Sequence, residues 1–140
     1  MSNANTPVLR LDGIRKSFNG NEVLRGISFD VNRHEVVAVL GPSGSGKSTL
    51  MKCVNLLERV DDGQIWLADT DITDPRVRQD EIRSRIGVVF QQFNLFPHMS
   101  VMNNVTLAAT KVHHWSKAKA EARALELLDR IGMRAKAGAY

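Results

Sequence analysis

Short apolar segments alternate with turn residues over roughly the first thirty positions of the chain. Residues 8–11 and 14–18 have strand-like patterns, and Asn19-Gly20-Asn21 is a strong hairpin turn signal. Two further strand-like segments follow at residues 23–24 and 27–31. This pattern predicts a small antiparallel sheet at the start of the chain.

The pattern then changes to continuous apolar runs at residues 36–40 and 86–90. Such runs, rich in valine, are typical of strands buried on both faces of a parallel sheet. Helical spacing of apolar residues predicts helices at 48–58, 101–110 and 117–131. Residues 61–63 form a turn signal, residues 64–68 and 70–72 are strand-like, and residues 79–84 are compatible with a short helix. The order of elements predicts an α/β protein.

The segment at 117–131 has the clearest helical pattern in the chain. Its apolar residues at helical spacing predict one buried face, and Gly132 is the expected C-terminal cap. The residues expected on that face are Ala118, Ala122, Leu125, Leu128 and Ile131.

The amino-acid composition suggests few functional classes for this chain and argues against several. Apolar residues make up 43% and charged residues 24%, as in soluble globular proteins, and no apolar run is long enough to span a membrane. The net charge of +4 comes from scattered basic residues without interleaved aromatics, which argues against a nucleic-acid surface. Residues 1–7 lack the apolar core of a secretory signal and are expected to be a disordered leader. Cys53, the single cysteine, is expected to be a buried core residue, and His113-His114 a solvated turn.

The segment Gly41–Thr49 matches the phosphate-binding pattern G-x-x-x-x-G-K-[ST] between a predicted strand and a predicted helix. A triphosphate is a dense anion, which successive backbone N–H groups and a helix N-terminus can surround where side chains are small. The pattern predicts that Lys47 binds the β- and γ-phosphates of ATP and that the Ser48 hydroxyl ligates Mg²⁺. The nucleotide-binding residues expected here are Gly41, Pro42, Ser43, Gly44, Ser45, Gly46, Lys47, Ser48 and Thr49.

Three further segments make the chain resemble the nucleotide-binding domains of ABC transporters, from about Leu9 to Tyr140. Lys16-Ser17-Phe18 lies where that family places an aromatic residue that stacks on adenine, so Phe18 is a candidate for this role, with a buried sheet residue as the alternative. Residues 88–98 resemble the family's Q-loop, which makes Gln91 a candidate Mg²⁺ ligand and γ-phosphate sensor. Residues 61–65 resemble the turn into the second β-layer.

The resemblance implies a P-loop fold of ABC type: a parallel core sheet, an N-terminal antiparallel β-layer and the start of a helical subdomain. Residues 8–140 would form an incomplete nucleotide-binding domain, with an ATP-binding core at 8–92 and the helical subdomain from 93. The sequence at residues 53–58, 71–75 and 93–98 is most similar to that of importers of polar amino acids. The implied partners are transmembrane permease subunits, a second copy of the chain and, indirectly, an extracytoplasmic solute-binding protein, with the subunit at the cytoplasmic face of the membrane.

The 140 residues contain neither an apolar strand ending in Asp-Glu nor a Leu-Ser-Gly-Gly-Gln signature, and the family's switch histidine would lie beyond Tyr140. We therefore expect a fragment or truncated product that lacks catalytic residues and hydrolyses essentially no ATP by itself. A nucleoside monophosphate kinase, a soluble ABC protein and an inactive nucleotide-binding module remain alternatives.

Overall fold

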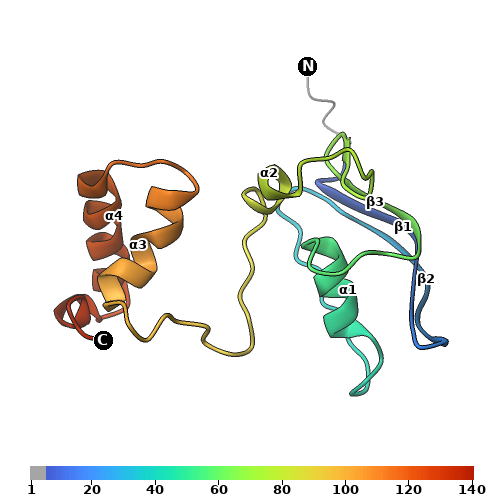
Figure 1. Cartoon of the computed structure of the whole chain (residues 1–140), viewed down its shortest axis with the longest axis horizontal. Helices are drawn as coiled ribbons and strands as arrows, with labels where there is room; N and C mark the ends of the chain where they lie inside the picture. Colours follow the sequence, from blue (N-terminus) through green and yellow to red (C-terminus); the bar gives the residue numbers. More distant parts are fainter. Residues whose placement is uncertain (1–5) are drawn as a thin grey trace. The chain divides into compact units, whose positions relative to one another are not determined.

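The computed structural model describes residues 6–140 and divides the chain into two compact units, Met1–Gly87 and Val88–Tyr140. The first unit holds a sheet with two helices, and the second holds a helical pair (Figure 1). Residues 1–5 of the expected leader lie outside the described residues, while Pro7 is buried.

The predicted antiparallel β-layer is confirmed in the first unit. Its four strands have the order β2-β1-β3-β4, and every pair is antiparallel. The predicted strands at 8–11 and 14–18 form one strand, residues 9–18, because the chain between them is a bulge and not a turn: the register shifts there and Gly13 has a φ of +62°. The strands are β1 (Leu9–Phe18), β2 (Asn21–Val31), β3 (Asp62–Leu67) and β4 (Thr70–Asp71).

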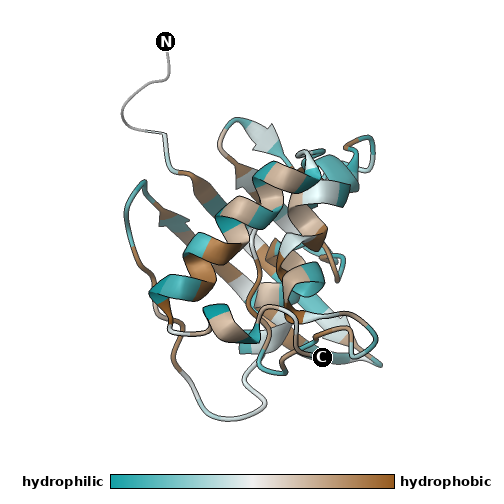
Figure 2. Cartoon of the chain, turned by 90° about the vertical axis from the view of Figure 1, so that its left-hand side faces the viewer, coloured by the Kyte–Doolittle hydropathy of each residue, from teal (hydrophilic) through white to brown (hydrophobic). Residues whose placement is uncertain are grey.

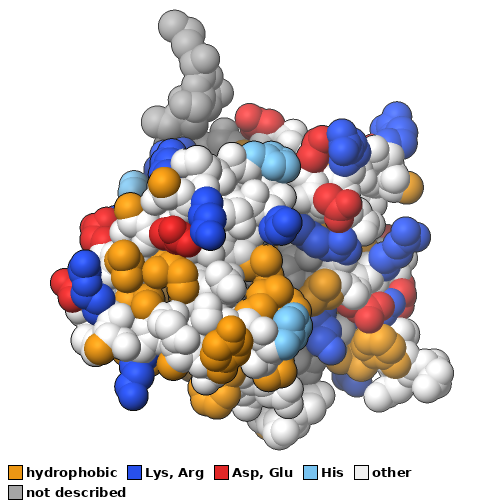
Figure 3. Space-filling model, turned by 60° about the vertical axis from the view of Figure 1, so that its left-hand side comes forward, with side chains coloured by type: hydrophobic (Ala, Val, Ile, Leu, Met, Phe, Trp, Pro, Cys, Tyr) orange, Lys and Arg blue, Asp and Glu red, His pale blue; other side chains and the backbone are white. Residues whose placement is uncertain are grey.

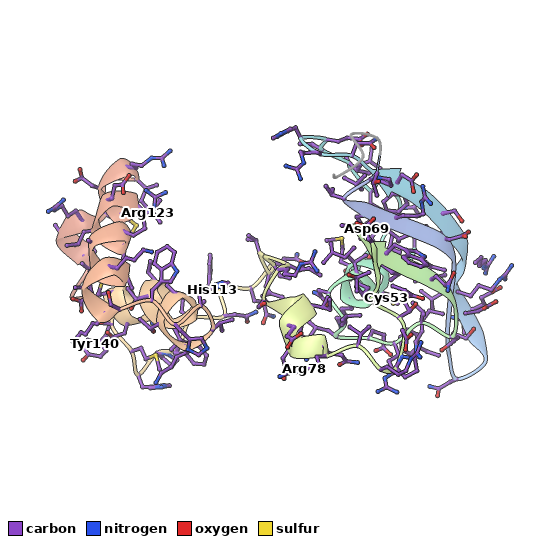
Figure 4. The ribbon with its side chains drawn as sticks, turned by 90° about the horizontal axis from the view of Figure 1, so that it is seen from above. Cys53, Asp69, Arg78, His113, Arg123 and Tyr140 are labelled. Carbon is purple, nitrogen blue, oxygen red and sulfur yellow. The ribbon has the colours of Figure 1, made fainter. Side chains whose placement is uncertain are left out.

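One helix, α1 (Lys47–Val54), packs on this sheet and completes the core (Figure 1). Leu50 and Cys53 of α1 belong to one buried cluster with apolar side chains of the strands, and Cys53 is 1% exposed (Figure 4). The prediction of a buried core cysteine is therefore confirmed. The helix is shorter than predicted because Leu56, with a φ of +59°, reverses the chain. The short predicted helix is α2 (Gln79–Arg83).

The predicted parallel strands at 36–40 and 86–90 are not formed, which corrects the expected parallel sheet. Neither segment is a strand, and within the described chain neither has a backbone hydrogen bond to a strand partner. Apart from Ile86, which packs against the core, the apolar side chains of the two runs are exposed, at 94% for Val36 and 100% for Val89. A run of β-branched residues favours an extended backbone, but a strand exists only where a neighbouring strand pairs with it.

The second unit is an antiparallel pair of helices, α3 (Val101–Lys111) and α4 (Lys117–Arg130), followed by the 3₁₀ turn η1 (Arg134–Lys136). Each helix begins at a serine, Ser100 or Ser116, whose hydroxyl accepts a hydrogen bond from the third backbone N–H of the helix. Figure 2 shows the alternation of hydrophobic and hydrophilic positions along these helices. Both predicted helices are confirmed, and Gly132 has the left-handed φ of a C-terminal cap.

The buried face of α4 agrees with the predicted one only in part: Leu128 is buried and Leu125 half-buried as predicted, but the other three positions are not. Ala120, Ala124 and Leu128 are buried, whereas Ala118 and Ala122 are exposed and Ile131 is 67% exposed. Both sets satisfy helical spacing, and the buried set has a small residue at two of its three positions. Helical spacing alone therefore does not decide which of the two faces is buried.

Candidate phosphate-binding site

The loop from Gly41 to Gly46 joins residues 36–40 to α1 and is shaped by two left-handed glycines. Gly44 has a φ of +79° and Gly46 a φ of +93°, which residues with a Cβ rarely adopt. The loop closes on itself through a hydrogen bond from Ser45 N to Pro42 O at 3.2 Å. A Cβ on Gly41 would lie 2.8 Å from Ser45 Oγ, so a larger residue there would require the Ser45 side chain to rotate.

Gly46 also fixes where α1 begins against the sheet. A Cβ at this position would lie 2.9 Å from Val23 Cγ1 and 3.0 Å from Leu24 Cδ2, both on β2. These distances are shorter than van der Waals contact. The absence of a side chain at Gly46 therefore lets the N-terminus of α1 rest directly on β2, next to the loop.

Lys47, the first residue of α1, turns its side chain back into the loop. Its ammonium donates to Gly41 O and Pro42 O, each at 2.7 Å, and to Ser45 Oγ at 3.3 Å. The positive charge of Lys47 thus lies within the curve of the loop, where uncharged oxygen atoms accept its hydrogen bonds. An anion held by the loop would compete with these acceptors and form stronger, charge-assisted hydrogen bonds with the same ammonium.

The first turn of α1 supplies a second source of positive potential. The N–H groups of Lys47, Ser48 and Thr49 lie in that turn and have no intrahelical acceptor. No side chain caps them, and the first turn carries no acidic residue. The exposed Ser48 hydroxyl lies at this same end of the helix. Loop, ammonium and helix terminus therefore converge on one anion-binding position.

A groove of about 410 Å³ runs beside the loop, between Gly44-Ser45 and the hairpin end of β2. Its volume falls within the range of small-molecule sites. Asn21, at one end of the groove, is the strand partner of Phe18, whose ring is 42% exposed. The first unit therefore brings the predicted phosphate loop and the hairpin of Phe18 to the same groove. The residues that line it are Asn21, Glu22, Val23, Arg25, Ile27, Gly44 and Ser45.

The sequence motifs did not identify the β2 residues of this groove. The available signal was the hairpin turn: once Asn19-Gly20 reverses the chain, the residues after it must lie beside Phe18. A separate cavity of about 100 Å³ lies between Cys53 and the segment 72–79. It is too small for a nucleotide.

Gln91, the other predicted ligand, belongs to the second unit. It is exposed and lies in a bend that precedes α3. The following segment is held to α3 by Asn104, whose side chain accepts from Phe96 N at 2.8 Å and donates to Phe96 O at 3.1 Å. Phe93, in contrast, is 93% exposed. Figure 3 shows hydrophobic side chains lying between charged ones on the face of the molecule in that view.

The histidines and the tryptophan between α3 and α4 are not grouped with further residues into a metal site in the part of the chain that the structure describes. His113, labelled in Figure 4, and His114 are exposed in the connection between α3 and α4. Among the described residues, no three His, Cys, Asp or Glu side chains are grouped as a metal site. The Lys119 ammonium lies over the ring of Trp115, with its Nζ 4.4 Å from the ring centroid. Within residues 6–140 no helix has the length and hydropathy needed to cross a membrane.

Comparisons with known proteins agree with this geometry. A family model described as "ABC transporter" matches residues 24–139. A probable amino-acid ABC transporter ATP-binding protein of Haemophilus influenzae is 45% identical over 95% of the chain and 54% of its own length. The arginine transport ATP-binding protein ArtM of Bacillus subtilis is 44% identical over 95% of the chain and 55% of its own length.

A solved structure of the dimeric ATP-binding cassette MJ0796, in a post-hydrolysis state bound to ADP and Pi, has a TM-score of 0.80 and 29% identity. That match covers 93% of this chain and 60% of the other. The chain thus spans about half the length of the curated relatives it matches.

Proposed function

Because the chain belongs to the ABC transporter family, we propose that residues 41–49 bind the phosphates of ATP and that the whole protein is the ATP-binding subunit of an amino-acid importer. The α/β fold of the family accounts for the antiparallel layer, the loop and α1. The observation that carries the proposal is the Lys47 ammonium held within a glycine loop at the N-terminus of α1. Family membership argues against the monophosphate kinase alternative.

In this proposal the chain's own groups share the phosphate charge. Backbone N–H groups of the loop and of the first turn of α1 bind phosphate oxygens, and Lys47 exchanges its carbonyl acceptors for the β- and γ-phosphates. The glycines of the loop leave its backbone N–H groups without neighbouring bulky side chains, and the left-handed conformations of Gly44 and Gly46 give the loop its curve. Ser43 and Ser45 also carry small side chains.

The residues of the loop also fit a Mg²⁺ ion bound with ATP. The Ser48 hydroxyl is an exposed oxygen donor at the phosphate end of α1, and oxygen donors are what Mg²⁺ prefers. We propose Ser48 as a protein ligand of this ion, and the resemblance of residues 88–98 to the family's Q-loop keeps Gln91 as a second candidate ligand. A bound Mg²⁺ ion supplies charge neutralisation of the β- and γ-phosphate oxygens.

For the base, we propose that Phe18 stacks on adenine. Its ring is partly exposed at the hairpin beside the groove, as a stacking platform must be. Replacing Phe18 with alanine should weaken ATP and GTP binding to similar extents, by about 1 kcal/mol or roughly fivefold, because stacking accepts any purine. Calorimetric titration of both nucleotides measures this. Unchanged dissociation constants for both would place Phe18 among the sheet residues without a ligand role.

The transport role rests on the named relatives. The names of those relatives include amino-acid and arginine transport, which supports import of a polar amino acid. We propose that the whole protein works at the cytoplasmic face of the membrane with transmembrane permease subunits, a second ATP-binding subunit and an extracytoplasmic solute-binding protein. The exposed segment from Phe93 to His98, which follows Gln91 directly, is our candidate for the permease contact.

Hydrolysis is assigned to the family rather than to these 140 residues. Phosphoryl transfer to water needs groups that orient the water and stabilise the developing charge. The sequence contains no strand-borne Asp-Glu pair and no signature loop. We therefore propose that residues 1–140 bind ATP without turning it over, and that turnover belongs to the whole protein. An inactive binding module and a soluble ABC protein are the other proposals compatible with the same loop.

A further inference from the structure

Lys16 is a charged residue in an unusual position. It lies on β1 two residues before Phe18, and its side chain is only 11% exposed. An ammonium withdrawn from water is stable only where it is paired and hydrogen-bonded. The motif that identified Phe18 gives Lys16 no role of its own, so its surroundings need an explanation.

Two carboxylates from the segment between α1 and β3 hold the Lys16 ammonium. Its Nζ is 3.0 Å from Glu58 Oε1 and 3.1 Å from Asp61 Oδ1. Glu58 is the main cause that raises the pKa of Lys16 above its ordinary value, with burial acting in the opposite direction. The ammonium is therefore charged at physiological pH and fixed between two anions.

Asp61 also fixes the backbone next to Lys16. Its second oxygen, Oδ2, accepts a hydrogen bond from Ser17 N at 2.6 Å, and its own N–H donates to Arg15 O at 2.9 Å. The Ser17 N–H, followed by the Lys16 ammonium, lowers the pKa of Asp61, so this carboxylate stays ionised. The end of β1 is thus clamped on both sides of Lys16.

The clamped ammonium lies over the ring of Phe18, 5.1 Å from its centroid. The contact forms where the register of β1 with β2 shifts, between Lys16 and Ser17, so it is a feature of this strand end and not of regular strand alternation. A cation beside an aromatic ring is attracted to the negative face of its quadrupole. The charge therefore favours one orientation of the ring, while Phe18 remains 42% exposed for a ligand.

We propose that Lys16 is a positioning residue for base recognition: anchored by Glu58 and Asp61, it holds the Phe18 ring in the orientation that receives the nucleotide base. The inference rests on the proposed stacking role of Phe18. Helix α1 connects the proposed phosphate site with the proposed base site, because it begins at the phosphate loop and the anchoring carboxylates follow its C-terminus. One helix and the turn after it would place both the phosphate groups and the ring.

The test compares ATP with inorganic tripolyphosphate, which has phosphates but no base, by calorimetry on the full chain. Lys16→Met should weaken ATP binding roughly three- to fivefold, the range expected for a lost cation–π contact, and leave tripolyphosphate binding unchanged. Lys16→Arg, which keeps the charge, should retain ATP affinity within about twofold. On a Phe18→Ala background, Lys16→Met should cause no further loss of ATP affinity.

Glu58→Gln gives a second route if Lys16→Met does not fold. It loosens the anchor but keeps the ammonium, and it should weaken ATP binding about twofold without affecting tripolyphosphate. Equal losses for ATP and tripolyphosphate would show that Lys16 acts on the fold alone and would overturn the inference. An unchanged ATP affinity in Lys16→Met, with a loss in Phe18→Ala, would overturn it and leave the role of Phe18 intact. An unchanged affinity in Phe18→Ala would overturn both.

Discussion

Replacing Lys47 with alanine is expected to lower ATP affinity on the order of 100-fold, or about 3 kcal/mol, because a side chain that forms charge-assisted hydrogen bonds to two phosphates is removed. Its ammonium lies on Gly41 O and Pro42 O, so it is already inside the loop and little reorganisation precedes binding. Isothermal titration with ATP and Mg²⁺ measures the loss.

Lys52→Ala is the matched control for this variant. Lys52 lies on the same helix, is exposed and carries the same charge, but it belongs to the last turn of α1. Its removal tests whether net charge alone attracts the nucleotide, and it should change ATP affinity by less than about twofold, because exposed charges are screened by solvent. Equal losses in Lys47→Ala and Lys52→Ala would contradict a specific role for Lys47.

The second large effect concerns the junction between the loop and the sheet. Gly46→Ala is expected to reduce the free energy of unfolding by about 3 kcal/mol. Left-handed backbone strain costs about 1 kcal/mol, and a Cβ placed 2.9 Å from Val23 Cγ1 adds the cost of overpacking, about 2 kcal/mol. The urea midpoint of unfolding, followed by circular dichroism, measures this change.

Gly44→Ala separates the two causes. Gly44 has a similar positive φ of +79°, but a Cβ there would meet nothing within 4 Å. This variant should lose only the strain contribution, about 1 kcal/mol. If the two variants were equally destabilised, the close contact between the start of α1 and β2 would not matter for stability, contrary to our description.

Local patterns predicted the elements that depend on local chemistry. The hairpin turn at Asn19-Gly20 and the glycines of the phosphate loop follow from the backbone preferences of a few residues, and the helices at 101–110 and 117–131 follow from the spacing of their apolar residues. For this reason the antiparallel layer and three helices could be placed from the sequence. The position of Lys47 at the start of α1 was predictable in the same way.

Features that depend on distant partners were not predictable. The apolar run at 36–40 has the composition of a buried strand, but pairing is decided by a neighbouring strand and not by the run itself. Helical spacing allows more than one buried face on α4, and it did not distinguish the face of Ala120 and Ala124 from the predicted one. The ion pairs of Lys16 join residues 42 and 45 positions apart, and no local signal connects them.

The most direct test of phosphate binding at residues 41–49 is an amide NMR titration of the ¹⁵N-labelled chain with ATP and Mg²⁺, repeated with AMP. Our account predicts that ATP shifts the amide signals of Gly44 to Thr49 most strongly, and that AMP, which lacks β- and γ-phosphates, shifts them little. ATP shifts that leave these amides unchanged and gather instead around Cys53 and residues 72–79 would contradict the assignment of the loop as the phosphate site.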